Sequence, residues 1–307
     1  MKEIKLFAPA TVANVSCGFD VLGFCLDPIG DEMIIRKTDQ PGVRITKIEG
    51  HDLPLSTKKN VAGVAAEALL ASLDTSFGFE IEIYKKIKAG SGIGSSAASS
   101  AGAVFGINEL LGRPYSRNEL IQFAMKGEVL ASGVGHADNV APALLGGFTL
   151  VRCNKQVDVV ALPSPSELYA TIIHPKIELR TADARSVLKK NIPLNKAIEQ
   201  WGNLAALVSG LYTDNYELIS RSLVDVIIEP ERSPLIPFFS ELKGVALDAG
   251  ALGSGISGSG PSIYALSRGE ETAKKVRQAM EKVFLPMNID FDTYVSKINT
   301  EGIKIIE

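Results

Sequence analysis

Cysteine and histidine are scarce in this sequence. The 307 residues include three of each, with no CxxC pair and no HExxH motif. Three scattered cysteines exclude the disulfide framework of a small secreted protein. Histidines as far apart as His51, His136 and His174 give no spacing for a zinc site built by the protein. The sequence therefore excludes both kinds of cross-linked scaffold.

Long apolar runs and an excess of positive charge are also lacking. No stretch reaches the roughly 20 uninterrupted apolar residues of a membrane helix, and the N-terminus lacks the pattern of a secretory signal. The 32 Lys and Arg residues against 35 Asp and Glu residues give a net charge of −3. This balance leaves no basic field for nucleic acid or an anionic membrane. We expect a soluble cytoplasmic protein that binds neither.

The sequence does contain alternating strand and helix patterns in both halves. Its length predicts about two domains, and its content of 46% hydrophobic and 22% charged residues is typical of a globular chain. The prolines Pro163 and Pro165 indicate a boundary near residues 155–165. Periodicity predicts strands at 2–8, 33–37, 43–48, 79–84, 148–152, 157–162, 168–174, 244–249, 262–267 and 292–298, and helices at 60–73, 95–111, 116–131, 194–212, 214–227, 233–241 and 270–284. We expect an α+β protein with domains at 1–155 and 156–307.

Glycine is in slight excess and gathers in clusters. The first cluster, Gly90-x-Gly92-x-Gly94-Ser95-Ser96, follows a predicted strand and opens a predicted helix. Glycines let backbone amides turn toward a ligand, and a helix N-terminus offers free N–H groups and a positive dipole end. This combination favours a phosphate site, although the lysine of a Walker A loop is absent. A flexible Gly/Ser turn is the alternative interpretation.

The second cluster, Gly253-x-Gly255-x-x-Gly258, fits the dinucleotide-binding pattern but not its context. That pattern must open a helix, whereas Gly260 and Pro261 lead into a predicted strand. We therefore expect a tight loop between two strands, which either closes over a ligand or is a structural turn.

A polar loop leaves the first predicted strand, at residues 8–20. Asn14 and Asp20 are its candidates for hydrogen bonds to a ligand. Taken alone, the segment is more typical of an Asx turn.

Three segments together resemble the motifs of the GHMP small-molecule kinases, and they occur in the family's order. They are 9–20, the glycine loop at 90–98, and 257–262. Lys88 stands where the family usually has a proline. The resemblance implies a two-domain GHMP kinase fold, with an N-terminal domain like domain 2 of ribosomal protein S5 and a ferredoxin-like C-terminal domain. It also implies ATP as co-substrate and an active site between the domains.

Within that superfamily, further segments resemble the homoserine kinases: 14–20, 135–142, 181–185 and 229–232. The implied reaction phosphorylates the side-chain hydroxyl of L-homoserine, giving O-phospho-L-homoserine in threonine biosynthesis. A zwitterion needs a carboxylate for its ammonium and arginines for its carboxylate. By resemblance, Asp20 binds the ammonium, Arg185 and Arg232 bind the carboxylate, and the remaining substrate residues are Asn14, His136, Asn139 and Thr181. Without the motifs, both arginines would be taken as surface charges.

The resemblance also implies the nucleotide and metal residues. Asn60 would contact adenine, although it could equally be a plain helix N-cap. Ser96 and Glu128 would bind Mg²⁺, a hard cation that takes oxygen ligands, whereas a glutamate on a helix is usually a solvated charge. The loop that would bind the ATP phosphates comprises Lys88, Ala89, Gly90, Ser91, Gly92, Ile93, Gly94, Ser95, Ser96, Ala97 and Ala98.

The proton acceptor and the substrate both leave alternatives open. Asp138 resembles the catalytic base of related kinases, but direct proton transfer to the γ-phosphate, with Asn14 or Asn139 positioning the hydroxyl, is equally compatible with the sequence. The alternatives to a homoserine kinase are a GHMP kinase for another small alcohol such as mevalonate, and a nucleotide-binding module without activity. Family members are often dimers, so a homodimer is a possible assembly.

Overall fold

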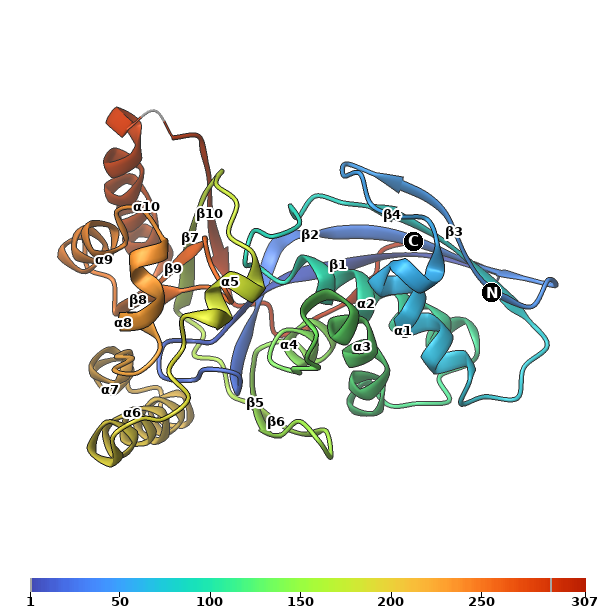
Figure 1. The fold of residues 1–307 in the computed structure, drawn as a ribbon, viewed down its shortest axis with the longest axis horizontal. Helices are drawn as coiled ribbons and strands as arrows, with labels where there is room; N and C mark the ends of the chain where they lie inside the picture. The colour runs from blue at the N-terminus through green and yellow to red at the C-terminus, as the bar shows by residue number, and fades with distance from the viewer. Residues whose placement is uncertain (1, 288) are drawn as a thin grey trace.

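The computed structural model describes residues 2–287 and 289–307, and its first domain is built on a long, mainly antiparallel sheet (Figure 1). The strands follow the order β11-β1-β2-β4-β3, and β5 and β6 extend the sheet from the early half of β2. β3 and β4 are the parallel pair. The strand bounds are β1 Glu3–Ala13, β2 Leu22–Thr38, β3 Gly42–Glu49, β4 Gly78–Tyr84, β5 Phe148–Cys153, β6 Asp158–Leu162 and β11 Lys304–Ile305.

Four helices lie together on one side of this sheet (Figure 1). They are α1 Val61–Leu70, α2 Ser95–Leu110, α3 Arg117–Ser132 and α4 Val140–Leu145, with a 3₁₀ turn, η1 Thr57–Lys59, before α1. The small residues of α2 let it pack closely on β2. A Cβ at Gly102 would lie 2.2 Å from the Met33 sulfur, and one at Gly106 would lie 2.5 Å from Ile35 Cγ1. The glycines therefore fix how near the middle and the second half of α2 approach the sheet.

The second domain has a four-stranded antiparallel sheet in the order β10-β7-β9-β8. In chain order this is the 4-1-3-2 arrangement of a β-α-β-β-α-β ferredoxin-like fold. Helices α9 and α10 cover one face, while the other face joins the core of the first domain, where the Tyr264 and Phe24 rings are 6.0 Å apart. The bounds are β7 Leu168–Pro175, α5 Thr181–Ser186, α6 Leu194–Tyr212, α7 Tyr216–Ser222, α8 Glu229–Arg232, η2 Ser233–Leu235, α9 Phe239–Asp248, β8 Gly253–Ile256, β9 Ile263–Arg268, α10 Glu270–Phe284, η3 Leu285–Met287 and β10 Phe291–Lys297.

The predicted α+β architecture in two domains is confirmed, but the boundary at residue 155 divides the first sheet. β6 lies beyond that residue and pairs with β5, with Phe148 opposite Leu162. β11 returns from the end of the second domain and pairs with β1, with Leu6 opposite Ile305. The chain passes to the second sheet between residues 162 and 168, at the two prolines. None of the helices in the described residues is sufficiently long and apolar to span a membrane.

The predicted strand at 244–249 is wrong, because residues 244–248 belong to α9 and Ala249 is its C-cap. The predicted helix at 233–241 accordingly covers only the turn η2 and the start of that helix. The strand that precedes β9 is β8, which lies inside the second glycine cluster and is fully buried. Two smaller differences concern the segment around Arg185, which forms the short helix α5 although no helix is predicted there, and the predicted helix at 214–227, which ends at Ser222.

Candidate active site

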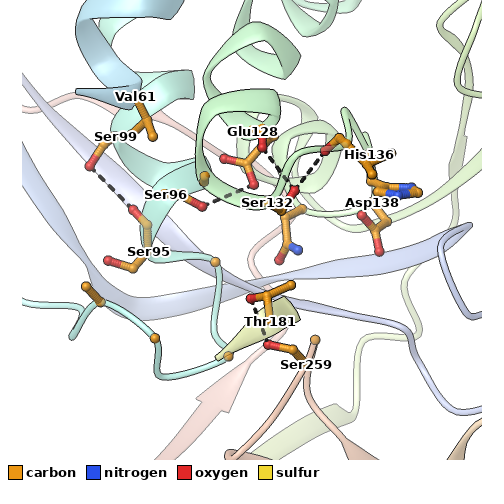
Figure 2. A pocket seen from close by; sticks show the side chains of 18 of the residues that line it. Val61, Ser95, Ser96, Ser99, Glu128, Ser132, His136, Asp138, Thr181 and Ser259 are labelled. Carbon is orange, nitrogen blue, oxygen red and sulfur yellow. Dashed lines mark hydrogen bonds between the residues drawn. The ribbon is translucent and has the colours of Figure 1, made fainter. Parts of the chain in front are cut away.

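A cleft of about 390 Å³ is lined by residues of both domains. It brings together most of the predicted site residues, and Figure 2 shows several of their side chains around it. Lys88, Ser91, Ile93, Ala97 and Ala98 are not part of its lining; Lys88 is exposed and the other four are buried behind the loop. The predicted residues that line the cleft are Asn14, Asp20, Asn60, Ala89, Gly90, Gly92, Gly94, Ser95, Ser96, Glu128, His136, Asp138, Asn139, Thr181, Arg185 and Arg232.

The glycine loop between β4 and α2 enters the cleft in a conformation that only glycine adopts readily. Gly90, Gly92 and Gly94 have φ angles of 75°, 82° and 71°, in the left-handed region. Gly94 is also the N-cap residue of α2. The free N–H groups at the start of α2 therefore lie beside the cleft, as an anion site requires.

The loop after β8 supports this glycine loop from the second domain. The Ser257 hydroxyl donates to the Gly92 carbonyl at 2.7 Å, and the Ser262 amide donates to the Ser91 carbonyl at 3.3 Å. A Cβ at Gly92 would lie 2.7 Å from the Ser257 and Gly260 carbonyls. The second glycine cluster therefore contacts the first directly, and it has no helix to serve a dinucleotide site.

Ser96 and Glu128 meet across the cleft, from α2 and α3. The Ser96 hydroxyl donates to Glu128 Oε2 at 3.1 Å (Figure 2). Glu128 is buried, and its Oε1 accepts no hydrogen bond from the described residues. Burial raises the pKa of Glu128 to about 7, against the opposing effects of the Ser96 hydrogen bond and the Lys85 charge. Because Glu128 is buried, it is not a solvated charge on the surface of the helix. A hydroxyl beside a carboxylate oxygen that has no partner fits the binding of a hard cation.

Lys85 is a cleft residue that the sequence analysis missed. Its ammonium is buried, forms an ion pair with Asp31, and donates to the Ser95 carbonyl at 2.9 Å and the Ser99 hydroxyl at 3.1 Å. Residues of β4 alternate inward at Phe79, Ile81 and Ile83, and Lys85 continues that parity. This alternation in the sequence predicts that the Lys85 side chain points inward.

The two groups expected to bind opposite ends of the zwitterion pair with each other in this structure. Arg185 Nη2 lies 2.9 Å from Asp20 Oδ1, and His136 Nε2 lies 3.7 Å from Asp20 Oδ2. Thr181 belongs to α5, as Arg185 does, and its hydroxyl lies 3.3 Å from the Ser259 hydroxyl (Figure 2). A ligand with both an ammonium and a carboxylate could divide this ion pair into two new ones.

Arg232 is a buried cation rather than a surface charge. It is 3% exposed, and its guanidinium donates to the Ala184 carbonyl at 2.9 Å and the Gly258 carbonyl at 3.1 Å. Burial, and then the neighbouring Arg185 charge, lower the pKa of Arg232 to about 10. The group stays protonated at neutral pH and forms no ion pair with the described residues, which favours an anionic ligand beside it.

The two asparagines are held by neighbouring loops. Asn14 donates to the Gly258 carbonyl at 2.7 Å and accepts from the Asp20 amide at 2.8 Å, six residues further on, which is not the contact of an Asx turn. Asn139 accepts a hydrogen bond from the Thr11 hydroxyl at 2.8 Å. Within residues 2–287 and 289–307 its amide nitrogen has no hydrogen-bond partner, which leaves a donor for a ligand.

Asp138 and His136 precede α4 and reach the cleft side by side (Figure 2). Burial, and then the charges of Asp20 and Glu128, raise the pKa of Asp138 to about 7. Burial lowers the pKa of His136, whose ring nitrogens have no hydrogen-bond partner among the described residues. A carboxylate with a pKa near 7 suits proton transfer at neutral pH.

Asn60 lines the far end of the cleft and caps α1. Its Oδ1 accepts from the Ala62 amide at 3.0 Å, and its Nδ2 donates to the Pro54 carbonyl at 2.9 Å. The N-cap interpretation therefore holds here, and the adenine contact stays a prediction.

Comparison with known families defines the class of protein. Residues 59–147 match the family described as GHMP kinases N terminal domain, and residues 203–285 match GHMP kinases C terminal. The mevalonate kinase fold is also similar, with a TM-score of 0.71 at 16% identity. The chain is a member of the GHMP kinase superfamily.

Full-length relatives define the family within that class. The homoserine kinase of Chlorobium phaeobacteroides (strain DSM 266) is 48% identical, and that of Chlorobaculum tepidum is 46% identical. The first match covers 100% of both chains and the second covers 100% of this chain and 99% of the relative. A crystal structure of homoserine kinase from Cytophaga hutchinsonii superposes with a TM-score of 0.96 at 54% identity, covering 100% of this chain and 98% of the other. The chain belongs to the homoserine kinase family.

Proposed function

We propose that this protein transfers the γ-phosphoryl group of ATP to the side-chain hydroxyl of L-homoserine, producing O-phospho-L-homoserine for threonine biosynthesis. One observation carries the proposal: a glycine loop suited to phosphate and a set of charges suited to an amino-acid zwitterion line the same cleft. Asp20 supplies the negative charge, and Arg185 and Arg232 supply the positive charges. Mevalonate has a carboxylate but no ammonium, so it would leave Asp20 without a partner.

Substrate binding begins from the Asp20–Arg185 ion pair. Asp20 accepts the substrate ammonium, and Arg185 turns from Asp20 to the substrate carboxylate, which Arg232 binds from its buried position. Asp20 and Arg185 therefore each exchange one partner of opposite charge for another as the substrate enters, and Arg232 gains one. His136 and Thr181 complete the walls around the substrate side chain.

The nucleotide phosphates lie against the amides of the glycine loop and the first turn of α2. Phosphoryl transfer depends mainly on positioning and on stabilising charge. Ser96 and Glu128 would hold Mg²⁺, which when bound neutralises charge on the phosphates. Asn60, at the other end of the cleft, would contact the adenine.

The hydroxyl proton has two possible acceptors. In the first route Asp138 takes it while the substrate oxygen bonds to the γ-phosphorus and the bond to the β-phosphate oxygen breaks, releasing ADP. In the second route the proton goes directly to the γ-phosphate, and Asn14 and Asn139 hold the hydroxyl in line. The raised pKa of Asp138 supports the first route.

A coupled assay of ADP release tests this function. L-Homoserine should give rapid turnover, whereas mevalonate and galactose should give little. Turnover on mevalonate alone would identify a different kinase of the superfamily. ATP binding without turnover on any substrate would indicate a nucleotide-binding module and would overturn the kinase proposal.

A further inference from the structure

The Phe19 ring is close to both arginines of the substrate site, although Phe19 is not among the residues that line the cleft. It belongs to the loop between β1 and β2 and is half-buried. The guanidinium carbon of Arg232 lies 4.8 Å from the centroid of its ring, and that of Arg185 lies 5.5 Å from the same centroid. Both distances are within the roughly 6 Å range of a cation–π interaction.

This shared contact reduces the repulsion between the two positive charges in the site. Arg185 and Arg232 come from α5 and α8 and must converge on one carboxylate, yet their like charges repel. Arg185 has Asp20 as a counter-charge, but no carboxylate among the described residues lies within salt-bridge distance of Arg232. Its hydrogen bonds go to neutral carbonyls. The charge of Asp20 also acts on Arg232, and the negative face of the Phe19 ring is a second compensation that both cations share.

We propose that Phe19 is a positioning residue for the carboxylate of the amino-acid substrate, acting through Arg185 and Arg232. The inference rests on the proposed function, because it assumes that these arginines bind that carboxylate. The ring holds the two guanidiniums beside each other before the substrate arrives, and it remains their partner when Arg185 leaves Asp20. Its effect is therefore confined to binding of the amino acid and does not extend to the nucleotide.

Replacing the aromatic ring by an aliphatic side chain of similar size tests this role. Phe19→Leu should raise KM for L-homoserine about tenfold, which corresponds to the ~1–2 kcal/mol of a desolvated cation–π contact, and should leave kcat and KM for ATP unchanged. Phe19→Tyr keeps the ring and should retain the wild-type KM. Phe77→Leu is the matched control, because Phe77 has Lys37 over its ring at 3.5 Å in the first domain and lines no part of the cleft.

Fluorinated phenylalanine separates the charge interaction from packing. Trifluorophenylalanine at position 19 keeps the size of the ring and removes its negative face, so it should raise KM for L-homoserine as Phe19→Leu does. This substitution also keeps the test intact if the leucine variant folds poorly. An unchanged KM in the fluorinated protein, or equal increases in the KM values for L-homoserine and ATP, would overturn the inference.

The inference and the proposed function can fail separately. Wild-type turnover and calorimetric binding of L-homoserine are measured first. If the wild type neither binds nor phosphorylates L-homoserine, both are overturned. If the wild type is active and the fluorinated protein has the same KM, Phe19 has no positioning role and the kinase proposal stands.

Discussion

Two glycines of the phosphate loop have matched backbones and different surroundings. Gly90 has a φ of 75°, and a Cβ added there would meet no atom within 4 Å. Gly94 has a φ of 71°, and its Cβ would lie 2.1 Å from the Thr11 hydroxyl oxygen. Gly90→Ala and Gly94→Ala therefore share the same left-handed strain, about 1–2 kcal/mol. They differ in the steric conflict with Thr11.

The size of that difference follows from what Thr11 does. Thr11 is fully buried and donates a hydrogen bond to Asn139 at 2.8 Å. Moving its hydroxyl away costs that hydrogen bond, about 1 kcal/mol, and forcing a methyl group into packed surroundings costs ~1–3 kcal/mol. We expect Gly94→Ala to lower the free energy of unfolding by about 2–4 kcal/mol more than Gly90→Ala does. It should also lower kcat, because Asn139 loses its support.

Urea unfolding followed by circular dichroism measures the stability difference, and ADP release measures kcat. The double variant Gly94→Ala with Thr11→Ala removes the conflicting hydroxyl and should recover part of the lost stability, in a double-mutant cycle. Equal destabilisation by the two single variants would refute the reasoning. It would mean that backbone strain alone explains why the loop needs glycine.

Three further predictions concern the charged groups. Arg185→Ala should raise KM for L-homoserine about 10- to 100-fold, since a charge-assisted hydrogen bond contributes ~1.5–3 kcal/mol, and leave KM for ATP nearly unchanged; equal increases would contradict the assignment. Asp138→Asn should lower kcat about 10²–10⁴-fold, and wild-type kcat should fall as the pH drops through about 7; a variant with near-normal kcat would favour direct transfer to the phosphate. Burial raises the pKa of Glu128 from 4.5 to about 7, so the stability of the metal-free protein should decrease as pH rises through that interval. In urea unfolding without Mg²⁺, Glu128→Gln should be more stable than the wild type above about pH 7 and equally stable below about pH 4. A difference in stability between the two proteins that does not change with pH would contradict a raised pKa of Glu128.

Local patterns predicted the elements whose own sequence carries a strong signal. The capping box at Ser116 and Glu119 begins α3, and the alternation of Phe79, Ile81 and Ile83 marks β4. The run Val245 to Leu247 carries no such signal, because a short apolar run fits a strand and a buried helix equally well. Its helical packing is decided by α10 and the second sheet, which no local pattern describes.

β8 could not be predicted because its own sequence disfavours a strand. Its sequence, Gly-Ser-Gly-Ile, has poor strand propensity. It is a strand because β9 supplies its hydrogen bonds, from Gly253 opposite Leu266 to Ile256 opposite Ile263, and its first position has room only for glycine. A Cβ at Gly253 would lie 2.4 Å from the Leu223 Cβ.

The members of the candidate site were predictable by resemblance, but their contacts with one another were not. Asp20 and Arg185 were expected to bind different ends of a ligand, and only the structure reveals that they form an ion pair. Lys85 was not predicted because it lies outside every motif, although it lines the cleft. Phe19 lies within the segment 14–20, but an apolar side chain gives no sign in the sequence that it contacts two arginines.

The pairing of β11 with β1 has a consequence for how the protein is made. The first sheet is not complete until residues 304–305 have been synthesised and have reached the edge of β1. Arg117 then fastens the returning segment, donating to the Leu144 carbonyl at 2.8 Å and the Ile303 carbonyl at 2.9 Å. Until that segment is made, the first sheet has an open edge along β1, and a fragment cut between the domains would lack this strand.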